Sequence, residues 1–200
     1  MKNYLAVDTS NEYLTVIACK DGVETVAFEP HCGMQHSVRL MGAVEETLSR
    51  AGLSPEACDF FCAVTGPGSF TGIRIGISCA KGLSAALAKP AVGITSFQTL
   101  AYNAEGKLLA AVPAGRGFYY LAAFAEDKSL LFSPVRADEK ELFRLSEIYP
   151  VYSRFPLPVP YTEADPAAGL AAALRSSAGN ELSAFYLKKS QAEEEREKGR

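Results

Sequence analysis

Two short segments carry residue types that could bind phosphate. The first is the glycine-rich run at residues 66–72, GPGSFTG, which follows an apolar stretch and precedes a helical pattern. In this position, backbone N–H groups and a helix N-terminus can face an anion. The run is not a P-loop, because no lysine follows its last glycine. Nor is it the dinucleotide fingerprint, because Gly68 and Gly72 are one residue too far apart. A tight strand-to-helix turn without a ligand is the alternative.

The second segment is Asp8-Thr9-Ser10, a turn between two expected strands. In actin-like ATPases and sugar kinases an acid and hydroxyls at this place face phosphate and metal; an ordinary Asx turn is the alternative. A site that holds phosphate and a metal ion in this way needs a second acidic turn from the other half of the molecule. The corresponding turn, Pro113–Gly117, has no carboxylate. The acidic turn that the second half would have to supply is therefore missing. The candidate nucleotide or phosphate contacts are Asp8, Thr9, Ser10, Gly66, Gly68 and Ser69.

Histidine and cysteine do not assemble into a catalytic or metal-binding set. His31 and His36 are the only histidines, and their spacing places them on no common helical face, so a surface or capping role is expected. The five cysteines are scattered, and the pair Cys58 and Cys62 has no second pair to complete a zinc site. We expect no metal site, no catalytic residue, and a reducing, cytoplasmic setting.

Hydrophobic periodicity predicts the same order of elements twice along the chain. The first half reads as strands at 4–7, 13–19 and 23–28, a helix at 37–51, a strand at 60–65, a helix to about 89, a strand at 91–95 and a helix at 97–103 capped by Ser96. The second half reads as strands at 108–112, 118–126 and 129–135, a helix at 138–145, a strand at 150–153 and a helix at 166–176. We predict two similar α/β halves, 1–104 and 105–200, of which the second is abbreviated and ends in a charged tail at 191–200.

The helix after the glycine run has a row of small residues at i, i+4 spacing. The row comprises Gly72, Gly76, Ala80, Ser84 and Ala88, and a second row comprises Ser78, Gly82 and Ala86. A glycine inside a helix costs about 1 kcal/mol relative to alanine. That cost is tolerated where another backbone comes close. The neighbour is either a helix of this chain or a helix of another subunit.

The helix at 37–51 has two apolar stripes. We expect Val38, Met41, Val44 and Leu48 to face the core, which leaves Leu40, Ala43, Thr47 and Ala51 as a second stripe that a helix on a sheet does not need. Two helices that each carry a small or apolar face beyond the one needed for the core indicate an interface with another protein. The predicted interface residues are His36, Arg39, Leu40, Ala43, Thr47, Gly72, Ile73, Gly76, Ile77, Ala80 and Ser84. Leucine at Gly76 and Ala80 is expected to abolish pairing and leave the monomer folded.

Composition excludes some classes of protein. The chain has 200 residues, an apolar content of 48% and a net charge of −3 that is spread along its length. A protein that holds nucleic acid by itself needs a clustered basic field, which this sequence lacks. It contains no run of 18 apolar residues, and its first residues lack the layout of a signal peptide, so we expect neither a membrane span nor secretion.

Several segments, in order across nearly the whole chain, resemble the bacterial TsaB family. They are GPGSFTGIRIGISCAKGLSAAL at 66–87, LAVDTS at 5–10, HSVRLM at 36–41, VGITSFQTLA at 92–101 and FYLKKSQAEEE at 185–195. The paralogous TsaD carries a related glycine segment together with a metal-binding H-x3-H pair. This sequence has no such pair, so the resemblance is to the TsaB type, and a metallopeptidase is improbable.

The resemblance implies a duplicated actin-like (ASKHA, ribonuclease H-like) fold and a heterodimer with TsaD, with TsaE as a further partner. That assembly forms N6-threonylcarbamoyladenosine next to the anticodon of tRNAs that read codons beginning with A. The family member supplies no catalytic residue and no cofactor of its own, with ATP entering at the level of the complex, and it meets tRNA only through the complex. Without its partner it pairs with itself. An actin-like ATPase or small-molecule kinase is the alternative function.

Two departures from the family pattern affect the second half. Pro113-Ala114-Gly115 replaces the usual Asp-Ala-Arg-type turn, and this half is some tens of residues shorter. Any contact with nucleotide that depends on the second half is therefore in question, whereas the predicted interface of the first half is unaffected.

Overall fold

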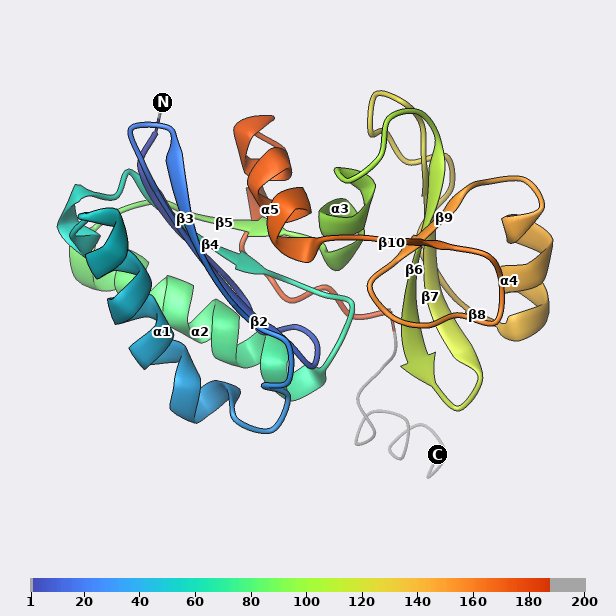
Figure 1. Cartoon of the computed structure of the whole chain (residues 1–200), viewed down its shortest axis with the longest axis horizontal. Helices are drawn as coiled ribbons and strands as arrows, with labels where there is room; N and C mark the ends of the chain where they lie inside the picture. The colour runs from blue at the N-terminus through green and yellow to red at the C-terminus, as the bar shows by residue number, and fades with distance from the viewer. Residues whose placement is uncertain (1, 188–200) are drawn as a thin grey trace, which may run out of the picture.

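The computed structural model describes residues 2–187 and contains two β-sheets, one in each half of the molecule (Figure 1). The first half contains β1 (Tyr4–Asp8), β2 (Leu14–Lys20), β3 (Val23–Glu29), α1 (His36–Ala51), the 3-10 turn η1 (Pro55–Ala57), β4 (Phe60–Val64), α2 (Phe70–Leu87), β5 (Ala91–Ile94) and α3 (Ser96–Ala101). Its strands lie in the order β3-β2-β1-β4-β5. The first three are antiparallel, and β1, β4 and β5 are parallel.

The second half repeats this topology. It contains β6 (Leu108–Gly115), β7 (Phe118–Phe124), β8 (Val135–Asp138), α4 (Glu139–Ser146), β9 (Val151–Ser153), β10 (Thr162–Glu163) and α5 (Pro166–Arg175), followed by β11 (Asn180–Glu181). The strand order β8-β7-β6-β9-β10 and the strand directions match those of the first half. The duplicated α/β fold predicted from the order of elements is confirmed.

The abbreviation of the second half lies between β9 and β10. In the first half the equivalent connection, from β4 to β5, carries the 18-residue helix α2. In the second half residues 154–161 make this connection, and they form an extended segment with prolines at 156, 158 and 160 and no helix. Proline lacks the N–H that a helix interior needs, so this segment cannot replace α2.

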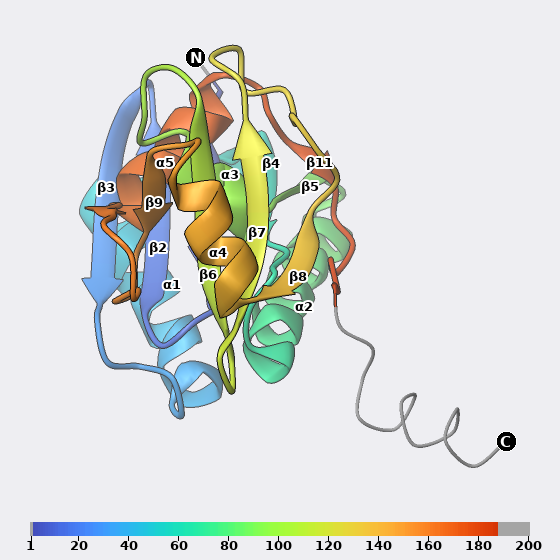
Figure 2. The same cartoon turned by 90° about the vertical axis from the view of Figure 1, so that its right-hand side faces the viewer.

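The layers follow from the alternation of side chains along β1. Leu5 and Val7 point into a core closed by α1 and α2, whereas Tyr4 and Ala6 point to the opposite face, where α5 packs. Figure 1 shows α1 and α2 on one side of the first sheet and α5 and α3 between the two sheets. Figure 2 shows α4 lying across the outer face of the second sheet. None of the helices within residues 2–187 is long and apolar enough to cross a membrane.

The last described segment returns to the first half. β11 pairs antiparallel with β5, and Leu170 and Leu174 of α5 belong to the same buried cluster as Tyr4 and Ala6. The predicted boundary at residue 104 therefore marks where the second sheet begins, but residues 166–181 pack against the first. Periodicity along the chain indicates an element but not the sheet on which it packs.

Two local predictions were wrong. Residues 129–134 form no strand of the second sheet. Ser129 instead closes an Asx turn in which its N–H and hydroxyl donate to the Asp127 carboxylate at 2.9 and 2.6 Å, and β8 begins only at Val135. The N-cap of α3 is Thr95, not Ser96, because the Thr95 hydroxyl and the Gln98 side chain form a reciprocal capping box. The charged tail at 191–200 lies outside the described residues.

Candidate functional site

The glycine run and the Asp8-Thr9-Ser10 turn are packed directly against each other. The N–H of Ser69 donates to the carbonyl oxygen of Ser10 at 2.6 Å, and the hydroxyl of Thr9 donates to the carbonyl oxygen of Gly72 at 2.7 Å. The Ser69 side chain caps α2 by accepting from the N–H of Gly72 at 3.2 Å. Two of the amides that could have faced an anion, those of Ser69 and Gly72, are therefore used within the chain.

The glycines of this region make room for the same turn. A Cβ atom at Gly68 would lie 2.1 Å from the Ser10 carbonyl oxygen, and one at Gly72 would lie 2.0 Å from the Thr9 carbonyl oxygen. One turn further along α2, a Cβ at Gly76 would lie 2.6 Å from the Thr9 hydroxyl. The row of small residues thus lets α2 approach the turn after β1 of its own chain. The neighbour lies within this chain, but it is a turn, whereas both explanations drawn from the sequence had assumed a helix.

Asp8 is the one acid of this region, and it is buried. Its Oδ1 accepts from the N–H and the hydroxyl of Ser10 at 2.8 and 2.6 Å, whereas its Oδ2 has no hydrogen-bond partner among the described residues. Burial raises the pKa of Asp8 above its usual value, which favours the neutral acid. The equivalent turn at the end of β6, residues 113–117, carries the exposed residues Pro113 and Arg116 and contains no carboxylate.

The space between the halves near this turn is almost filled. The Tyr13 ring of the first half stacks on Phe155 of the second, with centroids 6.2 Å apart. A cavity lined by both rings and by Ser96 has a volume of about 10 Å³. That volume is comparable with the space for one water molecule. Asp8, Thr9 and Ser10 are thus brought together with the glycine run as predicted, but in a closed arrangement.

Most of the predicted interface residues face inward. Nine of them are buried within this chain: His36, Leu40, Ala43, Thr47, Gly72, Ile73, Gly76, Ile77 and Ala80. His36 was expected at the surface, but its Nε2 donates to the Tyr13 carbonyl oxygen at 2.9 Å. Ser84 is half-buried and donates to the Lys89 carbonyl oxygen. Only Arg39 is exposed, where it forms an ion pair with Glu29.

The prediction for the two stripes of α1 was half right, because Val44 and Leu48 are buried as expected but the other two residues of the predicted core stripe are not. Val38 and Met41, expected in the core, are 80% and 56% exposed, whereas the supposed spare stripe faces the sheet. The sequence contains a signal that could have decided this. Glu45 and Ser49 share a helical face with Val38 and Met41, and a face with a charge in its centre is more often the one in water.

Three exposed apolar side chains, Met34, Val38 and Met41, therefore lie on α1 and in the turn before it, around the charged Glu45. On α2 the exposed residues Ser78 and Gly82 belong to the second row of small residues that the sequence indicated. We call this surface the α1–α2 face and define it as Met34, Val38, Met41, Gly42, Ser78 and Gly82. Its two helices meet where the Cys79 thiol lies 3.9 Å from the Met41 sulfur. A Cβ at Gly42 or at Gly82 would have no atom within 4 Å, so both glycines leave the backbone open to a neighbour.

Metal ligands do not gather in this part of the molecule. Within residues 2–187 there is no group of three or more histidine, cysteine, aspartate or glutamate side chains that could hold a metal ion.

Comparison with known proteins shows which family this chain resembles. The model of the family TsaD, tRNA N6-adenosine threonylcarbamoyltransferase, matches residues 30–133. The tRNA threonylcarbamoyladenosine biosynthesis protein TsaB of Escherichia coli (strain K12) is 34% identical over 130 residues, 62% of this chain and 56% of that protein. TsaB of Bacillus subtilis (strain 168) is 32% identical over 130 residues, 64% of this chain and 57% of that protein. The alignments thus span a little over half of each relative.

The fold is also found in a solved structure. YeaZ from Pseudomonas aeruginosa superposes with a TM-score of 0.78 at 24% identity, covering 94% of this chain and all of that one. At this identity the match concerns the fold alone, and it agrees with the two-half α/β architecture described above.

Proposed function

The chain belongs to the TsaD family and is of its TsaB, or YeaZ, type, and we propose that it acts as a non-catalytic partner subunit. In this role it binds and activates a TsaD-type enzyme that forms N6-threonylcarbamoyladenosine next to the anticodon of tRNAs reading codons that begin with A. TsaE is a further partner, and tRNA is met only through the complex. The observation that carries the proposal is the α1–α2 face.

The α1–α2 face has the chemistry of a protein interface. Met34, Val38 and Met41 are 97%, 80% and 56% exposed, and several large apolar side chains exposed on one helix and the turn before it are common at interaction sites. Methionine adapts its shape to a partner. The open backbone at Gly42 and Gly82 allows a partner helix to pack at short separation. The same face would support self-association when the partner is absent.

The arrangement around Asp8 supports a non-catalytic role. Phosphoryl transfer requires groups that hold phosphate and metal from both sides. Here one side offers a buried carboxylate, the other offers Pro113 and Arg116, and one cavity between the halves has a volume of about 10 Å³. These features disfavour the alternative of an actin-like ATPase or small-molecule kinase. Chemistry would therefore reside in the TsaD-type subunit.

The test is pairing with the TsaD-type enzyme of the same organism, followed by calorimetry and by the rate of threonylcarbamoyl transfer. The double variant Val38→Glu/Met41→Glu should weaken binding at least about tenfold, since it buries two unpaired charges in the interface. Phe143→Glu is the matched control, because Phe143 is 45% exposed on α4, away from this face. It should bind and activate as the parent does.

Two results would overturn the proposal. One is separate elution of the parent chain and the TsaD-type enzyme at concentrations where such subunits pair. The other is ATP hydrolysis by the chain alone that is lost in Asp8→Asn, which would favour the ATPase. In cells, depletion of this protein should lower the modified nucleoside in tRNA hydrolysates.

A further inference from the structure

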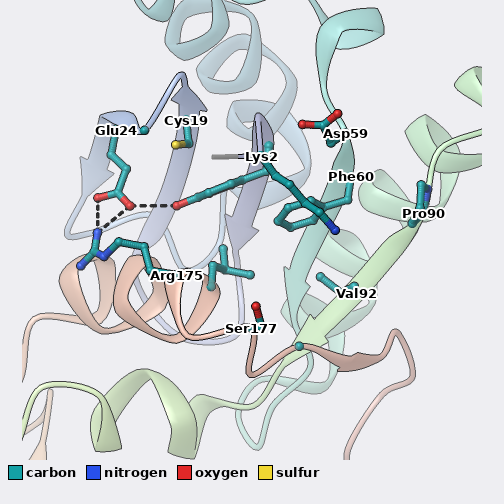
Figure 3. Close-up of a pocket in the computed structure, with 13 residues that line it drawn as sticks. Lys2, Cys19, Glu24, Asp59, Phe60, Pro90, Val92, Arg175 and Ser177 are labelled. Carbon is teal, nitrogen blue, oxygen red and sulfur yellow. Dashed lines mark hydrogen bonds and ion pairs between the residues drawn. The ribbon is translucent and has the colours of Figure 1, made fainter.

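A second cavity lies at the end of the first sheet opposite to the Asp8 turn. It has a volume of about 480 Å³, within the range of about 300–1,000 Å³ that is typical of small-molecule sites. It opens between the starting residues of β1, β4 and β5 on one side and the segment after α5 on the other (Figure 3). It shares no residue with the α1–α2 face or with the surroundings of Asp8.

The walls of this cavity suit a flat apolar group. On the sheet side, the rings of Tyr4 and Phe60 are stacked, with centroids 5.2 Å apart and an interplanar angle of 27°. Val92 of β5 extends this sheet side, and Leu174 of α5 lines the cavity on the other side. A slot with aromatic rings on one wall and an aliphatic side chain on the other favours a planar ring, because it offers stacking and dispersion contacts on both faces.

The acidic groups of the lining are already engaged. Glu24 accepts from the Tyr4 hydroxyl at 2.9 Å and from Nη1 of Arg175 at 2.6 and 2.7 Å, and these contacts are drawn in Figure 3. Burial, followed by the nearby charge of Glu24, raises the pKa of Tyr4 well above its usual value, so its hydroxyl keeps the proton that it donates. Asp59 accepts from the N–H of Asn3 at 2.7 Å.

The basic groups, in contrast, have donors to spare. Arg175 uses only Nη1 in its pair with Glu24, which leaves Nε and Nη2 available. The Lys2 ammonium forms no hydrogen bond or ion pair within residues 2–187. Figure 3 shows Lys2 beside Phe60 and Arg175 across the cavity. Spare donors on Lys2 and Arg175 favour a ligand that supplies acceptors, and Arg175 already neutralises the Glu24 carboxylate.

We propose that this cavity binds a small planar anion, an aromatic or heteroaromatic ring bearing one carboxylate, sulfonate or phosphate group. The ring lies between the Tyr4–Phe60 wall and Leu174, and the anionic group meets Lys2 beside Phe60, while the free donors of Arg175 add positive charge from across the cavity. The site is independent of the proposed role as a partner subunit, because the pairing surface lies on the other face of the sheet.

The test uses two fluorescent dyes of similar shape, 8-anilinonaphthalene-1-sulfonate and its uncharged counterpart N-phenyl-1-naphthylamine. The sulfonate should bind the parent at least about tenfold more tightly than the neutral dye, a difference equivalent to about 1.4 kcal/mol. Lys2→Gln/Arg175→Gln should abolish this preference and leave the affinity for the neutral dye within about twofold. Lys2→Gln alone, at an exposed position before β1, should give part of the loss without a risk to folding.

Two controls locate the dyes. Lys140→Gln/Arg144→Gln removes an exposed lysine and an ion-paired arginine from α4, and it should change neither affinity. Val38→Ser/Met41→Ser removes the exposed apolar side chains of the α1–α2 face. If this last variant loses the dyes while Lys2→Gln/Arg175→Gln does not, the dyes bind elsewhere and the proposal is wrong. Equal affinity of the parent for both dyes would also overturn it.

Displacement distinguishes the kinds of natural ligand. 1-Naphthoate and adenosine 5′-monophosphate carry a carboxylate and a phosphate, respectively, on planar rings. Displacement of the bound sulfonate by either one supports the site and identifies its preferred anion. Displacement by neither, at millimolar concentration, counts against it.

Discussion

The hydroxyl of Thr9 donates a hydrogen bond to the carbonyl oxygen of Gly72 at 2.7 Å, across 63 residues of sequence. It joins the turn after β1 to the first turn of α2, and both groups are buried. Because a carbonyl in the first turn of a helix is normally accepting from within the helix, this second bond requires the turn to come very close. That closeness explains why glycine occupies the helix at this point.

We predict opposite effects of alanine at two glycines of α2. Gly72→Ala places a Cβ 2.0 Å from the Thr9 carbonyl oxygen, so the helix must move off β1, and we expect a loss of about 3 kcal/mol or more. At Gly82 nothing lies within 4 Å of a Cβ. Gly82→Ala should therefore stabilise by about 0.5–1 kcal/mol through helix propensity. Urea unfolding of the three proteins measures both. Equal effects of the two substitutions would refute this account of the glycine row.

The double variant Gly76→Leu/Ala80→Leu should unfold the chain. From the sequence we had expected the same variant to block pairing and leave the monomer folded. A Cβ at Gly76 already lies 2.6 Å from the Thr9 hydroxyl, and Ala80 is 2% exposed. Circular dichroism should show lost cooperativity for Gly76→Leu/Ala80→Leu, whereas Val38→Glu/Met41→Glu should melt within a few degrees of the parent. A folded monomer carrying both leucines would mean that this face of α2 is not packed as described.

Asp8→Asn should stabilise the protein at neutral pH. Burial raises the pKa of Asp8, so the folded state binds this proton more tightly than the unfolded state does. Stability from this group is therefore fully present below the unfolded pKa of about 3.9 and declines as pH rises through the folded pKa. The variant should have the higher Tm at pH 7–8, and the difference should shrink as pH falls towards 4.

Asp127→Asn provides a control of opposite sign. Hydrogen bonds from Ser129 hold the pKa of Asp127 below its usual value, so its contribution is present at neutral pH and is lost as pH falls through the folded pKa. This variant should melt no higher than the parent at pH 7. If Asp8→Asn is less stable than the parent at every pH, the buried carboxylate is ionised and better solvated than the structure indicates.

Asn103 should be important for the junction between α3 and α5, which are equivalent helices of the two halves. Its Oδ1 accepts from the N–H of Asp165 at 2.9 Å, and its Nδ2 donates to the Thr99 and Asp165 carbonyl oxygens at 2.7 and 3.0 Å. Asn103→Ala removes all three bonds, of which the one to Thr99 is partly buried and water can replace the two to Asp165, and should cost about 0.5–1.5 kcal/mol. Asn180→Ala removes a single 3.3 Å bond at the surface and should change stability by less than about 0.5 kcal/mol. Denaturant midpoints compare the two variants.

The sequence by itself determined the order of the elements, their duplication and the family. These follow from local information: periodicity reports strand or helix, and the run at 66–72 with its neighbouring segments is specific enough to indicate relatives. It also indicated that the glycines of α2 serve a close approach, because a glycine in a helix needs such a reason. It further grouped the Asp8 turn with the glycine run as candidate phosphate contacts, and the structure places them together because both follow parallel strands at one edge of the sheet.

The tertiary structure alone decided what the glycines approach, which stripe of α1 is buried, and where residues 166–181 pack. Periodicity gives the angle between two apolar stripes on a helix but does not say which stripe faces the sheet. Val38 was therefore predicted to be buried and is exposed, whereas Leu40 was predicted to be exposed and is buried. The cavity at Tyr4 had no signal in the sequence, because Glu24 and Arg175 are 151 residues apart and meet only when α5 returns to the first sheet. Contacts of that range depend on the packing of whole elements, which no local pattern of residues encodes.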